Sequence, residues 1–548
     1  MSQSLGLVHG YGLSGAGSNL WTRSIVRALC RLGHTVHLVC QESRPEAYEF
    51  VGEARAYDAD GAPQPLFTRE TPYEGRCVVH RPALAVLPTY VRPRRRSEYV
   101  FAIPDLDDDA VEEYVARNAR VLARLAPEVV GFCVNHVVLS AQAAQRAKAE
   151  TGVLFAVLPH GSAIEYVVKK DPRMMRAASE TLAAADRVFA LNGEMEGRLR
   201  DVFGDVTGLM EKVARMPVGV DTEEFVVAAR SDRPSRVEHL ADLIADVPRG
   251  RTAEQQAALR DGLRGDLSED GLAALLRSGT DYVSSAPDAD AEAKLRQVDW
   301  AEAPVALYVG RLIAAKGLPT FVAAIPEVAA RVPEARFVIA GTGGLREAME
   351  ALVWAFAHGE VALARRIVAA GAALDDAGAR PEPFPHAAAY LDRLEAEGRL
   401  DALFERAAQQ LRTEHVVFTG FLDHGPLSEL YAVADVGVFP SVVREASPLV
   451  VPEAAASGTL PIGTDHGGMG DSLRTLAAEL PEAARDLVLL RAEPEHTVAD
   501  LVERMTTALQ EPGRYAEPLR AAAVARYDWR SIAARLAESL AALASPPA

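Results

Sequence analysis

The chain has 548 residues, more than one hydrophobic core can organise, so we expect two domains with additional elements. Its formal net charge of −18 argues against a nucleic-acid-binding protein and against a generally basic membrane-binding face. No apolar run approaches the roughly eighteen residues of a membrane span, and residues 1–9 are typical of a first strand rather than a signal peptide. The four cysteines lack metal-site spacing, which favours a reduced, cytoplasmic protein.

The amino-terminal region alternates short apolar strands with an amphipathic helix. We expect strands over residues 5–8 and 35–40 and a helix over residues 21–32 between them. Strands linked by crossover helices form a parallel, doubly wound sheet, so the predicted fold class is α/β. The loop before the helix is rich in glycine, which lets the backbone approach a ligand at a helix amino terminus.

A dinucleotide-binding dehydrogenase is one alternative for this loop. Gly12, Gly15 and Gly17, with the later Glu42, loosely resemble the dinucleotide fingerprint. Their spacing is not Gly-x-Gly-x-x-Gly, however, so the sequence disfavours a dehydrogenase.

Residues 92–96 form the one dense basic cluster of this acidic chain. A solvated loop is the simpler interpretation. The functional alternative is a grip on an anionic acceptor or an anionic lipid surface through Arg94, Arg95 and Arg96.

Polar residues follow two further predicted strands. Asn135 and His136 stand at the polar tip of one strand, and His160 follows a strand over residues 153–158. The carboxyl ends of strands are where open α/β sheets bind ligands, so all three are candidate site residues.

Two segments interrupt this alternation. Residues 226–303 are rich in Asp, Glu, Arg and Ala, with helical stretches over 252–263 and 269–276 and no strand signal of any length. Residues 352–412 are alanine-rich and also helical. We expect both to be helical insertions.

A second sheet begins with a strand over residues 305–309, and Arg311 and Lys316 follow it. Only six of the 58 basic residues are lysines, so a lysine here is more informative than usual. Further strands are expected over residues 336–340, before a glycine turn, and from residue 416.

The stretch from residue 436 to 470 organises the rest of the chain. A buried strand over residues 436–439 leads into a loop, and Ser447-Pro448 is a helix-start signal. Glu445 lies on the loop and Glu453 on the following helix, although Pro452 interrupts that helix. A helix amino terminus binds phosphate and carboxylates bind hydroxyls, which together suggest a sugar nucleotide.

In this order the motifs resemble the retaining glycosyltransferases of the GT-B fold, specifically family 4, over roughly 400 residues. The resemblance rests on Glu445-x7-Glu453, on Arg311 with Lys316 in the Gly-Arg-Leu…Lys-Gly loop, and on His160-Gly161. It implies two Rossmann-like domains that face each other across a cleft. The expected boundaries are residues 1–222 completed by a helix over 529–548, the insertion 226–303, and residues 304–528 with the insertion 352–412.

The resemblance also assigns site residues. It gives catalytic roles to His160, Glu445, Arg311 and Lys316. Donor binding falls to two groups of residues, the first being Gly15, Ala16, Gly17, Gly341, Gly343, Gly420, Phe421 and Leu422. The second is Ser447, Pro448, Leu449 and Glu453. Acceptor contacts fall to Asn135, His136, Arg94, Arg95 and Arg96. No metal and no cofactor is implied, because the two cations replace a metal ion at the diphosphate.

The implied reaction is the transfer of a hexose from a UDP-, GDP- or ADP-sugar to a hydroxyl of a small molecule, a saccharide or a lipid-linked acceptor. Three alternatives share this fold: a nucleotide-sugar epimerase, a glycoside phosphorylase and a non-catalytic sensor of sugar nucleotides. Expected partners are the donor and an acceptor that can be anionic, with no nucleic acid, at most peripheral membrane contact, and self-association as an option.

Overall fold

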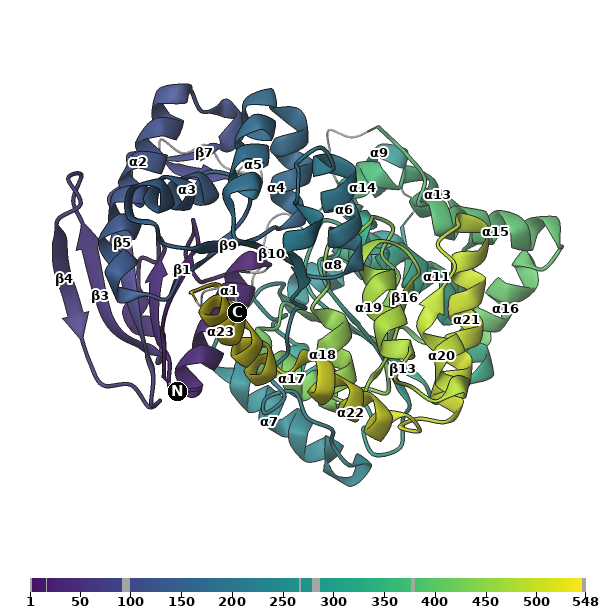
Figure 1. Cartoon of the computed structure of the whole chain (residues 1–548). Helices are drawn as coiled ribbons and strands as arrows, with labels where there is room; N and C mark the ends of the chain where they lie inside the picture. Colours follow the sequence, from purple (N-terminus) through teal and green to yellow (C-terminus); the bar gives the residue numbers. More distant parts are fainter. Residues whose placement is uncertain are drawn as a thin grey trace. The chain divides into compact units, whose positions relative to one another are not determined.

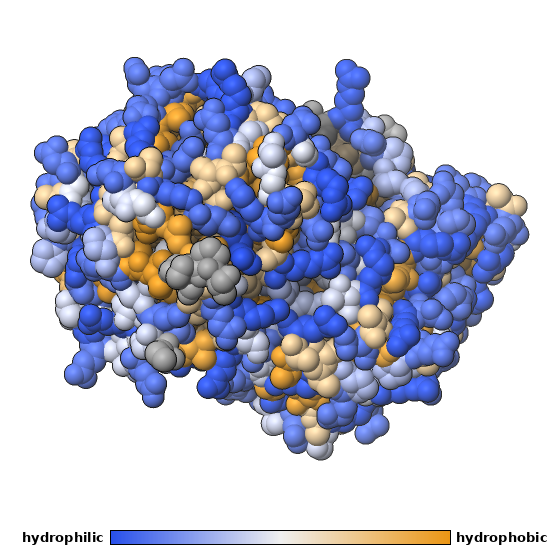
Figure 2. All heavy atoms as spheres, viewed as in Figure 1, coloured by the Kyte–Doolittle hydropathy of each residue, from blue (hydrophilic) through white to orange (hydrophobic). Residues whose placement is uncertain are grey.

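The computed structural model describes residues 2–15, 17–90, 99–265, 268–277, 286–375 and 380–544. The chain divides into two compact units. Unit 1 consists of Met1–Gly219 and Arg526–Ala548, and unit 2 consists of Val220–Ala525. Among these described residues, no helix is long and apolar enough to cross a membrane. Figure 2 shows one face, which is mostly hydrophilic with small apolar patches.

Unit 1 is built on a nine-stranded sheet in the order β11-β10-β9-β8-β1-β2-β5-β3-β4, parallel except for the β3–β4 pair. Its strands are β1 (Ser4–Val8), β2 (Thr35–Val39), β3 (Val51–Tyr57), β4 (Pro63–Thr68), β5 (Arg76–Pro82), β8 (Phe132–Asn135), β9 (Phe155–Leu158), β10 (Arg187–Ala190) and β11 (Val213–Arg215). A separate pair consists of β6 (Leu87–Thr89) and β7 (Val100–Ala102).

The central strands are short runs of buried apolar residues, as a sheet covered on both faces requires. Leu7 on β1 pairs with Leu38 on one side and with Cys133 on the other. The later strands are therefore added on both sides of β1, with β2 on one side and β8 on the other. Strand order thus reverses at β1 and β8, and the carboxyl ends of strands at such a reversal are where doubly wound sheets bind ligands.

The helices of unit 1 are α1 (Ser18–Arg31), α2 (Asp108–Leu125), α3 (Ser140–Thr151), α4 (Gly161–Tyr166), α5 (Pro172–Ala184), α6 (Gly193–Phe203) and α23 (Trp529–Ala544). Although α23 is distant in sequence, it packs beside α1 (Figure 1), with the Trp21 and Trp529 rings 6.3 Å apart. Gly219 allows this packing, because a Cβ there would lie 2.4 Å from the Trp529 ring.

Unit 2 is built on a fully parallel six-stranded sheet in the order β14-β13-β12-β15-β16-β17. Its strands are β12 (Val305–Val309), β13 (Arg336–Ala340), β14 (Val416–Gly420), β15 (Val436–Phe439), β16 (Leu460–Thr464) and β17 (Leu489–Leu490). The predicted bounds of β12, β13 and β15 are confirmed. Strand order reverses between β12 and β15, and the loops after two such strands are where doubly wound sheets bind ligands.

The helices of unit 2 include those of both predicted insertions. The first insertion carries α7 (Arg233–Ala245), α8 (Ala253–Leu263), α9 (Glu269–Leu276) and α10 (Ala291–Leu295). The other helices are α11 (Leu318–Arg331), α12 (Arg346–His358), α13 (Val361–Ala370), α14 (Ala372–Asp375), α15 (Pro385–Ala396), α16 (Leu400–Gln410), α17 (His424–Ala432), α18 (Val450–Ala456), α19 (Gly467–Ala477), α20 (Glu482–Val488), α21 (Pro494–Gln510) and α22 (Ala516–Tyr527).

Candidate active site

The loop after β12, residues 310–317, carries the two predicted phosphate-binding cations. The hydroxyl of the buried Tyr308 donates to the carbonyls of Arg311 at 3.2 Å and Lys316 at 3.3 Å, which closes the loop. Burial raises the pKa of Tyr308, and the Glu445 carboxylate adds to the effect, so the phenol stays a donor. Gly317 adopts φ +73°, and a Cβ there would lie 1.7 Å from the Pro440 carbonyl oxygen.

Lys316 and Glu445 form a direct ion pair. The Lys316 Nζ lies 2.5 Å from Glu445 Oε2, and the two side chains are 29% and 14% exposed. The exposed guanidinium of Arg311 has no hydrogen bond or ion pair within the described part of the chain. The site therefore presents one paired and one unpaired cation at the carboxyl ends of β12 and β15.

Glu445 is held through its backbone. The Gly468 amide donates to the Glu445 carbonyl at 2.6 Å, and a Cβ on Gly468 would lie 2.1 Å from the Ala446 carbonyl oxygen. Gly467 has φ +55°, with a Cβ position 2.9 Å from Arg444 Cα. The two glycines therefore let the start of α19 close on the loop that carries Glu445.

The helix that carries Glu453 begins later than the sequence suggested. Ser447 does not cap it: α18 starts at Val450, and its amino cap is Leu449, without a side-chain hydrogen bond. Pro452 is then only the third residue of the helix, where no intrahelical partner for its missing N–H would exist. Glu453 is buried, and His424 Nε2 lies 3.2 Å from its Oε1.

The glycine turns after β13 and β14 bring three loops into contact. The Gly341 amide donates to the Gly420 carbonyl at 2.8 Å. Cβ atoms on Gly341 and Gly343 would lie 1.9 Å from the Gly310 carbonyl oxygen and 2.4 Å from that of Leu312. In the following segment Phe421 is 38% exposed, whereas Leu422 is buried, so contacts of Leu422 with a ligand would be through its backbone.

In unit 1, His160 and Asn135 form a buried pair. His160 Nε2 lies 2.7 Å from Asn135 Oδ1, and Asn135 Nδ2 donates to the Val8 carbonyl at 3.1 Å. The Asn135 oxygen is thus the acceptor and His160 carries its proton on Nε2. Burial, with a smaller effect of His9, lowers the pKa of His160 to about 3, so the ring is neutral.

Asn135 is completely buried in unit 1, where its side chain orients His160, and its contact with the acceptor stays a prediction. His136 differs. It has φ +70° and is 1% exposed, and neither ring nitrogen has a hydrogen-bond partner among the described residues. Burial is the main cause that lowers its pKa well below the usual value. A strained histidine with two unsatisfied nitrogens is the stronger ligand-binding candidate.

Sequence reasoning missed two neighbours of His136. The Tyr90 ring stacks on it with centroids 3.9 Å apart, and the His9 ring lies 6.4 Å away. Burial lowers the pKa of His9 to about 4, although a hydrogen bond to Asn19 opposes the shift. The position of His9 directly after the central strand β1 was the available signal.

The glycine-rich loop leads into α1, whose amino cap is Gly17 with φ +66°; Gly15 has φ +107°. Glu42, the acid of the dehydrogenase alternative, is buried, and its Oε2 accepts the Leu13 amide at 2.7 Å. It serves the loop itself, which removes the ribose ligand that a dinucleotide site needs. Ala16, Arg94, Arg95 and Arg96 lie outside the described residues. Within the described ranges, no group of three or more His, Cys, Asp or Glu residues could hold a metal ion.

Two family models match the chain. Glycosyltransferase Family 4 matches residues 16–224, and Glycosyl transferases group 1 matches residues 303–379 and 394–510. The matches leave out residues 225–302, where the first insertion was predicted. The second predicted insertion, residues 352–412, is left out only at 380–393. The comparison with curated proteins returns no match.

Solved structures share the fold over the full length. Sucrose-phosphate synthase from Thermosynechococcus elongatus is 16% identical, with 99% of each chain covered and a TM-score of 0.52. The catalytic domain of starch synthase IV from Arabidopsis thaliana, bound to ADP and acarbose, is 13% identical, with 100% of each chain covered and a TM-score of 0.53. Anabaena HepE in complex with UDP and glucose is 14% identical, with 98% of this chain and 99% of HepE covered and a TM-score of 0.50. By its sequence motifs, its two doubly wound sheets and these matches, the chain belongs to the family 4 glycosyltransferases (glycosyl transferases group 1) of the GT-B fold.

Proposed function

We propose that the protein transfers a hexose from a nucleotide sugar to an acceptor hydroxyl with retention of configuration and without a metal ion. The observation that carries this proposal is the pairing of Lys316 with Glu445 beside Arg311, whose guanidinium has no partner among the described residues. A diphosphate that binds beside these residues offers Lys316 a doubly charged partner. Glu445 would then be released to accept a hydrogen bond from a sugar hydroxyl.

The chemistry follows from these charges. The bond between the sugar C1 and the β-phosphate oxygen breaks, and negative charge grows on the phosphate, where Lys316 and Arg311 stabilise it. The acceptor oxygen forms the new bond to C1 on the same face, and its proton passes to the leaving phosphate oxygen. This step needs no protein nucleophile, which agrees with a site that has no assigned pair of carboxylates as acid and nucleophile.

The donor class draws support from the neighbours, since HepE is bound to UDP and glucose and starch synthase IV to ADP and acarbose. These neighbours support UDP- and ADP-sugars as donors, whereas GDP-sugars enter the proposal only through the sequence resemblance. The acceptor side is assigned to His136, whose two unsatisfied ring nitrogens can bind hydroxyls. His160, neutral and oriented by Asn135, would bind a sugar hydroxyl rather than transfer a proton.

The experiment compares Lys316→Ala and Arg311→Ala with Lys169→Ala, whose lysine forms an exposed ion pair with Glu165 in unit 1. We expect each site variant to weaken nucleoside diphosphate binding in titration calorimetry and to lower kcat/KM by on the order of tenfold or more. The control should match the wild type. Unchanged affinity and turnover in both site variants would remove these residues from the site.

Product analysis separates the three alternatives. An epimerase converts the nucleotide sugar without any acceptor. A phosphorylase releases sugar phosphate when inorganic phosphate is supplied. A sensor binds the nucleotide sugar but forms no product with any acceptor. The proposed transferase requires an acceptor hydroxyl and releases the nucleoside diphosphate.

A further inference from the structure

The first insertion adds a short piece of backbone pairing to the end of β14. The Asp288 amide donates to the Thr419 carbonyl at 2.8 Å, and the Phe421 amide donates to the Ala286 carbonyl at 3.1 Å. Pro287 and Gly420 form an antiparallel bridge between them. On its other side the same segment is bonded to residues 250 and 251, through Gly250 N to Pro287 O and Ala289 N to Arg251 O, both at 2.8 Å. The segment 286–288 is therefore the middle of three paired pieces.

Gly420 makes this close approach possible. Its φ is +75°, and a Cβ there would lie 2.6 Å from the Asp288 amide nitrogen and 2.8 Å from Asp288 Oδ1. Any larger residue would push the inserted segment away from the loop. The glycine that the family resemblance assigns to the nucleotide thus also admits the insertion.

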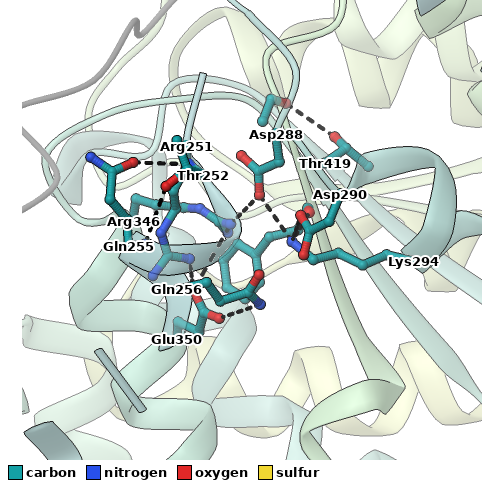
Figure 3. A network of polar contacts seen from close by, with 12 residues as sticks. Arg251, Thr252, Gln255, Gln256, Asp288, Asp290, Lys294, Arg346, Glu350 and Thr419 are labelled. Atoms are coloured by element: carbon teal, nitrogen blue, oxygen red, sulfur yellow. Dashed lines mark hydrogen bonds and ion pairs between the residues drawn. The ribbon is translucent and has the colours of Figure 1, made fainter. Parts of the chain in front are cut away.

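A buried network of charges anchors the segment (Figure 3). Asp288, only 3% exposed, accepts from Arg346 Nη2 at 2.5 Å and from Lys294 Nζ at 3.1 Å. The Arg346 guanidinium also lies over the Phe418 ring of β14, 4.2 Å from its centroid. Asp288 therefore joins the insertion to α12 and, through Arg346, to the strand that ends in the loop.

The network continues to Glu350, which accepts from Arg251 and, at 3.2 Å, from Gln256 Nε2. Burial opposes ionisation of Glu350, but Arg346, Arg251 and Lys294 outweigh it and lower its pKa to about 2. The network thus holds ionised groups of both signs at low exposure. Removing one of them leaves its partners uncompensated, so the arrangement is sensitive to a single neutralisation.

Beyond this anchored pairing lies Phe421, an exposed large hydrophobic residue of unit 2 with 38% of its surface accessible. Its amide is committed to Ala286, so the backbone that carries the ring is fixed by the insertion. An exposed aromatic ring on a fixed backbone is a stacking surface for a planar ligand, and a nucleobase has such a face.

We propose that the inserted segment 286–288 belongs to the nucleotide site: it fixes the Phe421 ring as the surface on which the base of the donor stacks, with Asp288 as the positioning residue. The inference rests on the proposed function, because it places a nucleotide at this loop. It assigns a role to an insertion that the family models leave out.

The test distinguishes binding of the nucleotide base from binding of the diphosphate. Titration calorimetry measures the affinities of UDP, ADP and inorganic pyrophosphate for the wild type and for Asp288→Asn, Phe421→Ala and Lys316→Ala. We expect Asp288→Asn and Phe421→Ala to weaken UDP and ADP by about five- to tenfold and to leave pyrophosphate within about twofold. Lys316→Ala should weaken all three ligands. Phe421→Tyr, which keeps an aromatic face, should retain wild-type affinity.

Two further variants serve as a second test and as a control. Lys294→Met removes a partner of Asp288 that is 16% exposed. It should weaken UDP and ADP binding, but not pyrophosphate binding, by a smaller factor than Asp288→Asn does. This variant provides a second test if Asp288→Asn does not fold. Glu238→Gln breaks the exposed pair with Arg296 in the same insertion and should change nothing. Equal losses for pyrophosphate and nucleotides, or no loss in the Asp288, Lys294 and Phe421 variants, would overturn the inference. A wild type that binds no nucleotide would instead overturn the proposed function.

Discussion

Because Lys316 and Glu445 form an ion pair, substitutions of the two residues should have opposite effects on nucleoside diphosphate affinity. Before a donor binds, Glu445 competes with the diphosphate for Lys316. In Glu445→Gln the competing charge is gone, so nucleoside diphosphate affinity should stay equal or increase. The sugar loses a carboxylate partner at the stage when its ring gains positive character, so kcat should fall by about tenfold or more. Calorimetry and steady-state kinetics on one preparation measure both effects. Weaker nucleotide binding without a loss of kcat would contradict this assignment.

Glu453 should behave differently because the proposed ligand is the nucleotide ribose, which does not change during transfer. Glu453→Gln keeps the size of the side chain and removes its charge, so it should chiefly raise the donor KM, with kcat nearly unchanged. His424 Nε2 lies 3.2 Å from the same carboxylate, which makes His424→Gln a control for the orientation of Glu453. If Glu453→Gln lowered kcat and Glu445→Gln raised KM, the assignment of the donor's two ends would have to be reversed.

The buried histidines of unit 1 predict a loss of stability in mild acid. Burial keeps the folded pKa of His9 near 4 and that of His160 near 3, below the ordinary value of about 6.5. Below pH 6.5 the unfolded chain therefore binds more protons, and the free energy of unfolding decreases as pH falls toward these values. The contribution of these two histidines is constant above about pH 7.5. Each histidine should remove about 2 kcal/mol at pH 5.

Hydrogen exchange of β1, β8 and β9 at pH 7.5, 6 and 5 measures this dependence. In His160→Gln the decrease in protection below pH 6.5 should be smaller by the contribution of one histidine, whatever the variant does to stability at pH 7.5. An unchanged slope would mean that groups other than His160 cause the acid sensitivity.

At the scale of elements, α23 is a required part of unit 1 although it is encoded far from the rest. Trp529 is 7% exposed and packs against Trp21 of α1. Trp529→Ala should therefore destabilise unit 1 by about 3–5 kcal/mol, and exchange should accelerate in α1 and β1 while the strands of unit 2 remain protected. Val524→Ala, at an exposed position of α22, is the matched control and should have no effect.

The sequence predicted elements best where they are short buried strands between turns. Strands β12, β13 and β15 appear with the predicted bounds because continuous apolar runs mark strands buried on both faces. The strands β3, β4 and β5 were not predicted. β4 is mostly exposed and lies at the edge of the sheet, so its residues carry no strong apolar pattern. Neighbours from distant parts of the chain stabilise such strands.

For the site residues too, local motifs predicted some features of the structure and not others. Local motifs were sufficient to bring Lys316 and Glu445 together, because both follow strands at the reversal of strand order. Burial could not be read from a motif, so the sequence did not indicate that Asn135 is buried and hydrogen-bonded to His160. The pairing of residues 286–288 with β14 was also invisible, since three residues among helices have no strand pattern.

For the whole molecule, the expected independence from metal is a property of its charges. If Lys316 and Arg311 neutralise the diphosphate, transferase activity should survive a strong chelator such as EDTA with less than about a twofold change. The measurement is product formation with and without EDTA. Complete loss of activity that Mg²⁺ or Mn²⁺ restores would contradict the mechanism and require metal ligands near the donor.

The split composition of unit 1 has a consequence for biosynthesis. Residues 1–219 leave the ribosome first, but the helix that covers α1 is made only after residues 220–525. Trp529 follows residue 219 by 310 residues, so at about 5–20 residues per second the Trp21 face of α1 stays uncovered for roughly 15 to 60 s after residue 219 is made. Unit 2 is synthesised during that interval. The nascent chain therefore passes through a stage in which the first unit lacks α23 and exposes an apolar helix face, the kind of surface that chaperones bind.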